Sequence, residues 1–273
     1  MGERQRGLAV AICAAGTAAP DLVRPGHVWS REEVAGWLLG AMPAETLVGL
    51  DLGCSLPFVD QGAFFPGWQD GPADARALWR LVERICAADA HLAAGSFVDH
   101  PEASRHFRRH GGRTGDRFGQ GRGRLRVTEE AQRAAGLNPY SNLNLVGAAQ
   151  VGKSSLTGMR VLNRLDGRLP IWPFDGDPGS GSLVVEIYTT IAAIAGGRTK
   201  SRSKMKSVEA LNDALAAIGS APVAGTGAID DHRSDALLAA AWLRTVADRA
   251  ALWHPAALTP AVARTEGWTF GIP

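Results

Sequence analysis

Short apolar runs alternate with longer amphipathic stretches along this chain, a pattern that predicts strands separated by helices. The runs Leu47–Leu52 and Leu183–Tyr188 are rich in Leu, Val and Ile, as expected of strands that are buried on both faces. The first apolar run, Gly7–Cys13, predicts a strand that a turn joins to a returning edge strand at Asp21–Arg24. A further short strand is predicted at Leu169–Trp172.

The amphipathic stretches predict helices between these strands. Ser30 and Glu33 have the spacing of a capping box, which predicts a helix that runs to about Ala41. Further helices are predicted over residues 74–89, 128–135, 154–165, 189–195, 208–218 and 232–247. Strands that alternate with helices predict an α/β fold, and the length suits a single domain over residues 1–273.

The segment Arg105–Arg133 differs from the rest, because it is rich in Arg and Gly and poor in apolar residues. We expect it to form a lobe within an insertion that covers about residues 60–165. Its arginines, Arg122 and Arg124 among them, are candidates for binding the phosphates of a nucleic acid. The alternative is a solvated loop whose arginines pair with acids elsewhere. Three rings of the lobe are candidate stacking surfaces for bases: His106, Phe107 and Phe118.

Charge and cysteine content limit the classes of partner. The net charge of +2 predicts no strong bulk attraction to nucleic acid, so any such attraction must be local. The three cysteines lack metal-ligand spacing, which predicts free thiols in a reducing, cytoplasmic compartment. No apolar run is long enough for a membrane span. Abundant Ala, Arg and Gly indicate a bacterial gene of high GC content.

A set of carboxylates carries the candidate chemistry. Asp51 lies in an apolar run, where a charge needs a metal, an arginine or hydrogen bonds as its partner. Glu186 lies in a second apolar run, and Asp231 and Asp235 lie at the start of a predicted helix with His232. If these stretches converge, their oxygen atoms would suit Mg²⁺ or Mn²⁺. The alternatives are a helix N-cap for Asp231 and a salt bridge for Glu186.

The segment Gly147–Ser154 matches the phosphate-loop pattern at every fixed position. In that motif Lys153 would reach the terminal phosphates of a nucleotide, and Ser154 would bind Mg²⁺. A nucleotide-hydrolysing sheet of this class usually needs about five buried strands, and the rest of the chain offers few. The alternative is a glycine turn with Lys153 as a surface charge.

Several short motifs together resemble the DUF429 proteins, which are predicted nucleases of the ribonuclease H-like superfamily. The resemblance implies a mixed five-stranded sheet flanked by helices, and acids that bind two metal ions for phosphodiester hydrolysis. It also implies that the phosphate-loop match is coincidental. The motifs that carry the resemblance are Val48–Pro57, Gly152–Leu156, Val184–Tyr188, His232–Ala236 and Glu266–Gly271.

The resemblance also assigns roles to single residues. Asp51 matches the acid of the fourth strand, Asp235 matches the acid of the last helix, and Glu186 is a less certain match on the fifth strand. His232 stands where such helices carry a further acid or a histidine. The superfamily has a first strand with an acid before the hairpin, and this chain is expected to lack it, which leaves a gap in the sheet and puts metal binding in question. The leading hypothesis is a metal-dependent nuclease, and the alternatives are a nucleotide-binding protein that uses Gly147–Ser154 and a non-catalytic binding module.

Overall fold

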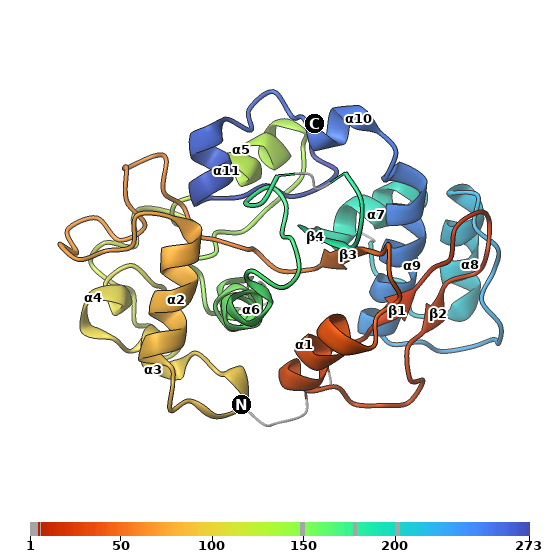
Figure 1. Ribbon diagram of the computed structural model, residues 1–273, viewed down its shortest axis with the longest axis horizontal. Helices are drawn as coiled ribbons and strands as arrows, with labels where there is room; N and C mark the ends of the chain where they lie inside the picture. Colours follow the sequence, from red (N-terminus) through yellow and green to blue (C-terminus); the bar gives the residue numbers. More distant parts are fainter. Residues whose placement is uncertain (1–4, 6, 148–150, 177–178, 200–202) are drawn as a thin grey trace.

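Two short strand pairs and a large number of helices make up this mixed α/β protein, seen in a computed structural model that describes residues 5, 7–147, 151–176, 179–199 and 203–273 (Figure 1). The strands are β1 (Ala11–Ile12), β2 (Asp21–Leu22), β3 (Leu47–Leu50) and β4 (Leu183–Glu186). The helices are α1 (Arg31–Gly40), α2 (Ala75–Ile85), η1 (Ala90–Leu92), α3 (Gly95–Val98), α4 (Pro101–Ser104), α5 (Val127–Ala134), α6 (Val151–Leu165), α7 (Thr189–Ala195), α8 (Val208–Ala217), α9 (Asp231–Val246), α10 (Ala250–Trp253) and α11 (Pro260–Thr265).

The pair β3–β4 lies at the centre of the molecule. Its strands are parallel, with Leu47 opposite Leu183 and Leu50 opposite Glu186. All four residues of β4 are buried, because single parallel bridges at Ile171 and Thr269 cover its other side. The predicted strand at Leu169–Trp172 is therefore reduced to one bridge.

The pair β1–β2 is a separate antiparallel hairpin, and it is much shorter than the predicted strand Gly7–Cys13. Helix α9 packs against β1, β2 and β3, so that one helix joins the two strand pairs (Figure 1). In the part of the chain that the structure describes, neither β1 nor β3 has a second strand partner on its other side. The sequence predicted one continuous sheet, but the structure has two separate strand pairs that both pack against α9.

The chain leaves β3 two residues earlier than the sequence predicts, since Leu52 donates its amide to the Leu50 carbonyl at 2.9 Å and turns the backbone. Gly53 follows in a crowded place, where a β-carbon would lie 2.3 Å from Asn142 Nδ2. Only glycine fits there, which explains why the strand ends beside α6.

Capping residues set the helix starts. The capping box of Ser30 and Glu33 at α1 is confirmed, with both reciprocal hydrogen bonds present. At α9 the N-cap is Asp230, whose side chain accepts the amide of Arg233 at 3.0 Å. The capping role considered for Asp231 is therefore wrong, because Asp231 is already the first helical residue.

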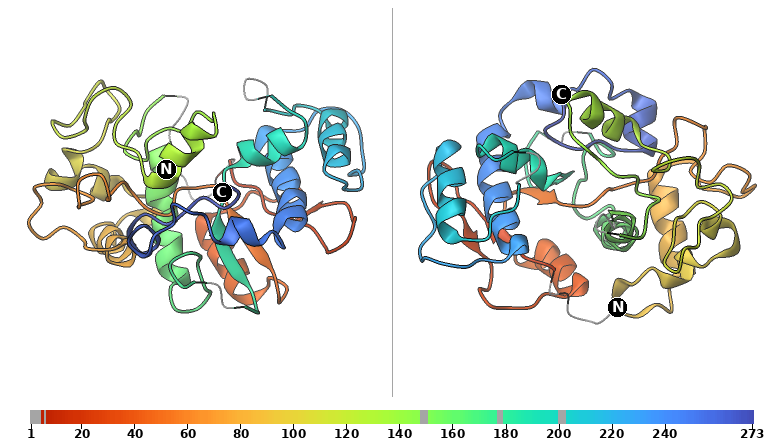
Figure 2. Two further views of the ribbon diagram at one scale, coloured as in Figure 1. Left: turned by 90° about the horizontal axis from the view of Figure 1, so that it is seen from above. Right: turned by 180° about the vertical axis from the view of Figure 1, so that it is seen from behind.

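The core consists of two apolar clusters, one on each side of β3–β4 (Figure 2). One contains Val48 and Val184 with side chains of α1, α2 and α6. The other contains Val185 and Ile187 with side chains of α7, α8 and α9 and the segment 268–272. The predicted insertion contributes α2 and α6 to the first cluster, so these helices are part of the common core. Among the described residues, no helix is both long and apolar enough to cross a membrane.

Candidate functional site

Asp51 lies directly after β3, at the edge of the sheet where both parallel strands end. Its two carboxylate oxygens accept hydrogen bonds from the amide and the hydroxyl of Thr189, each at 3.4 Å. Thr189 begins α7, three residues after β4. The edge beyond the carboxyl ends of parallel strands is where ligands bind in open α/β sheets, so Asp51 occupies a suitable position.

Asp235 comes to the same place from α9. Its Oδ2 atom lies 2.6 Å from Nζ of Lys204, and its side chain is 14% exposed. Burial lowers the pKa of Lys204, but the hydrogen bond and charge of Asp235, followed by the charges of Asp231 and Asp51, outweigh this and raise the pKa. Three carboxylates therefore act on one ammonium group.

The environment of Asp51 disfavours its negative charge. The protein around the carboxylate removes hydration and raises its pKa to about 6, and the charge of Asp235 adds to the rise, while Thr189 and Lys204 oppose it. The residue is exposed at the surface. Solvent therefore also reaches this carboxylate and screens part of its charge.

Glu186 does not join these acids. It pairs with Leu50 in the strand register, and successive strand residues point to opposite faces, so its side chain leaves the sheet on the face away from Asp51. There its carboxylate accepts hydrogen bonds from Arg126 at 2.6 and 2.8 Å, from the Thr269 hydroxyl at 2.6 Å and from the Cys54 amide at 2.6 Å. The salt bridge to an arginine, considered for Glu186 as the alternative to metal binding, is therefore confirmed.

Arg126 is the centre of a buried ionic network that the sequence did not indicate. Its side chain is 1% exposed and also pairs with Glu129. Its guanidinium donates to the carbonyl of Glu266, whose carboxylate accepts the amide of Val127. Burial lowers the pKa of Arg126, but the two carboxylates of Glu129 and Glu186 outweigh it and hold the pKa well above its usual value. This network ties α5, β4 and the C-terminal segment together.

His232 and Asp231 lie in the first turn of α9. The ring of His232 is exposed and lies so close to Gly7 that a β-carbon there would be 3.3 Å from it. Asp231 is near enough to Lys204 to raise its pKa. The structure thus brings Asp51, Asp231 and Asp235 around Lys204, with His232 adjacent along the helix.

The two arginines predicted to bind phosphate, Arg122 and Arg124, differ in exposure and in their partners. Arg124 is buried and donates to both oxygens of Asp60 and to the carbonyls of Phe64, Pro57 and Ala63, so no group of its side chain faces solvent. Arg122 is exposed, with its guanidinium on Asn138 and 5.3 Å from the ring of Tyr140. The three rings expected to stack on bases lie in the interior, which excludes that role: His106, Phe107 and Phe118.

The phosphate-loop match has the wrong surroundings. Residues 148–150 lie outside the described part, but the segment that precedes them makes only a single bridge at Asn144 instead of a strand. A β-carbon at Gly152 would lie 2.3 Å from the Asn142 carbonyl oxygen. Ser154 donates its hydroxyl to the Val151 carbonyl within α6, and Lys153 bonds to His110. The coincidental match that the family resemblance implies is consistent with this arrangement.

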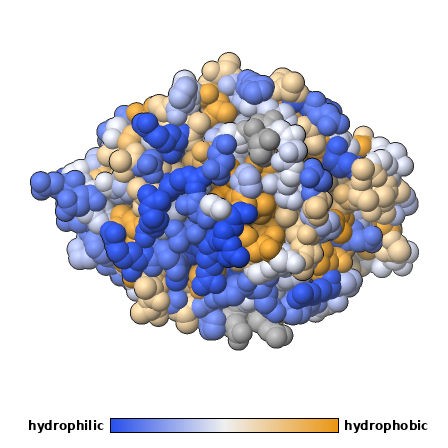
Figure 3. Space-filling view, viewed as in Figure 1, coloured by the Kyte–Doolittle hydropathy of each residue, from blue (hydrophilic) through white to orange (hydrophobic). Residues whose placement is uncertain are grey.

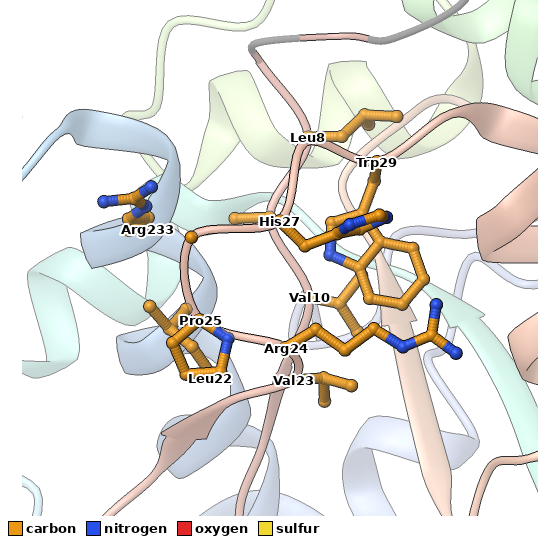
Figure 4. A pocket seen from close by; sticks show the side chains of 11 residues that line it. Leu8, Val10, Leu22, Val23, Arg24, Pro25, His27, Trp29 and Arg233 are labelled. Carbon is orange, nitrogen blue, oxygen red and sulfur yellow. The ribbon is translucent and has the colours of Figure 1, made fainter.

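Two recesses on the surface are unsuited to chemistry. The one beside the N-terminal hairpin has about 20 Å³, room for about one water molecule, and the guanidinium of Arg24 lies 5.0 Å from the Trp29 ring at its side (Figure 4). The other has about 190 Å³ and is lined by backbone and apolar side chains of residues 135, 137, 191, 194 and 271–273. Neither contains a carboxylate of the candidate site.

The donor chemistry of the acid site fits a divalent cation. Carboxylate oxygens are the ligands that Mg²⁺ and Mn²⁺ prefer, and the ammonium of Lys204 stands in for a cation between them. Within the described ranges, no group of three or more His, Cys, Asp or Glu side chains is arranged to hold a metal ion. In this arrangement Asp235 is paired with Lys204, whose ammonium occupies the place of a cation.

Sequence reasoning missed Lys204 and Thr189, which complete this site. Lys204 was part of a basic, serine-rich stretch without a recognisable motif, and Thr189 began an unremarkable short helix. The pairing of β3 with β4 brings Thr189 to Asp51, and the ion pair with Asp235 of α9 holds Lys204 nearby. Comparison with protein-family models finds no matching model, and comparisons with curated proteins and with solved structures find no match.

Proposed function

We propose that this chain is a ribonuclease H-like protein of the DUF429 type, with a metal-dependent nuclease site at Asp51 and Asp235. The position of these two acids carries the proposal: Asp51 lies where β3 ends and bonds to Thr189 at the start of α7, and α7 packs against α9, which carries Asp235. The arrangement of hairpin, parallel pair and crossing helix supports the fold assignment. Asp51 and Asp235 would hold Mg²⁺ or Mn²⁺, and Asp231 and His232 lie where they can assist.

The chain's own residues have distinct tasks in this proposal. Asp51 is oriented by the amide and hydroxyl of Thr189, which fixes its carboxylate at the sheet edge. Asp235 is held at the same edge by α9. Lys204 neutralises both acids until a cation takes its place. A cation held by Asp51 and Asp235 would polarise a phosphate and lower the pKa of a water for phosphodiester cleavage.

Cation binding is tested by the melting temperature in Mg²⁺ or Mn²⁺, measured against the same protein in chelator. We expect the wild type to melt at a higher temperature with metal, and Asp51→Asn and Asp235→Asn to lose this increase, because each removes a ligand charge. Asp248→Asn changes the same type of residue at an exposed position and should keep the increase. Lys204→Met should enlarge it, whereas Lys206→Met, at another exposed lysine, should not.

Cleavage is tested with fluorescent single-stranded and duplex oligonucleotides. Metal-dependent cleavage that Asp51→Asn and Asp235→Asn abolish, and that Asp248→Asn retains, supports a nuclease. Metal stabilisation without cleavage would leave a cation-binding module. An absence of metal stabilisation in both the wild type and Lys204→Met would contradict the proposed site.

A further inference from the structure

A basic hairpin lies next to the start of α6. Arg108 and Thr114 pair as its two arms, the amide of Arg109 bonds to the Arg113 carbonyl at 2.7 Å, and two glycines with positive φ form the tip at residues 111–112. Backbone hydrogen bonds from Arg108 to Leu143 and from Leu145 to Arg108 fix the hairpin against the segment before α6. The hairpin is therefore held in place by main-chain bonds and not by its charges.

Lys153 adds a further positive charge to this hairpin. Its Nζ atom lies 3.0 Å from Nε2 of His110. An ammonium group only donates, so Nε2 of His110 accepts and the ring proton is on Nδ1. The lysine of the phosphate-loop match thus belongs to a surface that also includes the hairpin.

This surface has an excess of positive charge. Arg109 and Arg113 share one carboxylate, that of Asp99, at 3.0 and 3.8 Å. The side chain of Arg108 is exposed and has no hydrogen bond or ion pair within the described part of the chain. Four cationic side chains therefore face a single acid, whereas most other arginines of the lobe are paired with acids or carbonyls.

The surface adjoins the acid site through direct contacts. Gly53, two residues after Asp51, donates its amide to the hydroxyl of Ser155 at 3.2 Å, and Ser155 is two residues after Lys153. Asn142 joins the same two segments by donating to the Ser55 carbonyl at 3.0 Å. These buried contacts join the start of α6 to the segment that follows Asp51, so we expect a phosphate chain on Lys153 to run toward the acid site.

We propose that Arg108, Lys153 and the hairpin between residues 108 and 114 bind the phosphate backbone of a nucleic acid strand beside the acid site. The inference deepens the proposed nuclease function, because it names the side chains that hold the substrate. Contacts to phosphate carry no base information, so binding at this surface is independent of sequence.

The test is fluorescence anisotropy of a labelled single-stranded oligonucleotide, measured in chelator so that neither metal binding nor cleavage contributes. We expect the double variant Arg108→Gln/Lys153→Gln to bind at least about tenfold more weakly than the wild type. For single strands, each lost phosphate contact lowers the salt dependence of log K by about 0.7, so the slope should fall by about 1.4.

The matched control is Arg168→Gln, an exposed arginine three residues beyond the opposite end of α6; that end, Leu165, is about 18 Å from Lys153 by the helical rise. It should leave affinity and salt slope close to those of the wild type. An equal loss in Arg168→Gln, or unchanged affinity in the double variant, would overturn the proposal. Asp51→Asn should retain oligonucleotide binding in chelator, so failure of the metal site and failure of this surface give different results.

Discussion

His106 is an uncharged histidine in the interior. Its side chain is 1% exposed, and its Nδ1 atom has no hydrogen-bond partner in the described part of the chain. Burial, followed by the charges of Arg124, Arg117 and Arg105, lowers its pKa to about 4, against a smaller opposing effect of Asp116. The sequence showed a histidine among arginines and suggested a stacking surface, but it did not indicate that the ring would be buried with its edge against Phe65.

This lowered pKa predicts a loss of stability in acid. Between pH 6.5 and about 4 the unfolded chain binds a proton at residue 106 that the folded chain does not, so the free energy of unfolding falls as pH falls. The loss should reach about 3 kcal/mol near pH 4, at 1.36 kcal/mol per pKa unit. Denaturant unfolding at several pH values should show a flatter dependence for His106→Phe. His254→Phe, at an exposed histidine, should keep the wild-type dependence.

At the acid site, the sequence indicated which carboxylates are of interest, but it did not indicate which side chains contact them. The apolar surroundings of Asp51 and the helix start at Asp235 were sufficient to select these two carboxylates. Glu186 has equally apolar neighbours, yet it is committed to Arg126 and Thr269. Which of two similar acids is buried in an ion pair and which stays at the sheet edge depends on the face of the strand, and that face depends on pairing partners far away in the sequence.

At the scale of elements, local signals were reliable and long-range ones were not. The capping box at α1 and the amphipathic pattern of α2 are local, and both helices form. The lengths of β1 and β3 depend on neighbouring strands and on the crowding at Gly53, so the predicted strands were too long. The network around Arg126 joins residues up to 140 positions apart, which no local pattern encodes.

The network around Arg126 is expected to stabilise the contact of α5 with β4. Glu186→Gln should lower the free energy of unfolding by about 3 kcal/mol, because it leaves part of a buried charge uncompensated. Glu130→Gln removes an exposed partner of Arg133 and should cost about 0.5 kcal/mol or less. Denaturant titration measures both.

The same pair of variants separates a structural role of Glu186 from metal binding. The rise in melting temperature with Mn²⁺ should be the same size in Glu186→Gln as in the wild type. A selective loss of that rise in Glu186→Gln would place this residue among the metal ligands instead.

At the scale of the whole molecule, the two apolar clusters meet at β3–β4. Val184 belongs to one cluster and its neighbour Val185 to the other, and both are fully buried. Alternate residues of one short strand thus support both halves of the core. The class of fold, mixed α/β, could be predicted from alternating strands and helices, but this sharing of one strand pair depends on tertiary packing.

Unfolding of the two halves should therefore be coupled. Val184→Ala and Val185→Ala should each lower the free energy of unfolding by about 2 kcal/mol, from the buried methyl groups lost and the cavity left. Each variant should retain a single transition that far-ultraviolet circular dichroism and tryptophan fluorescence report at the same denaturant concentration. Two separated transitions in either variant would show that the halves unfold independently.

The polar surface is unevenly distributed over the molecule. Figure 3 shows hydrophilic side chains gathered over the half that contains α2 and α4. The two halves are joined through β3–β4 and α9. Among the described residues, β1 and β3 each have one side without a strand partner.

Such unpaired strand sides have a consequence for how the protein behaves when it is concentrated. Main-chain donors and acceptors that water satisfies in dilute solution can be satisfied equally well by an extended segment of a neighbouring molecule. Crowding therefore favours lateral attachment between molecules, and the short length of β1 and β3 limits how many hydrogen bonds each such attachment gains.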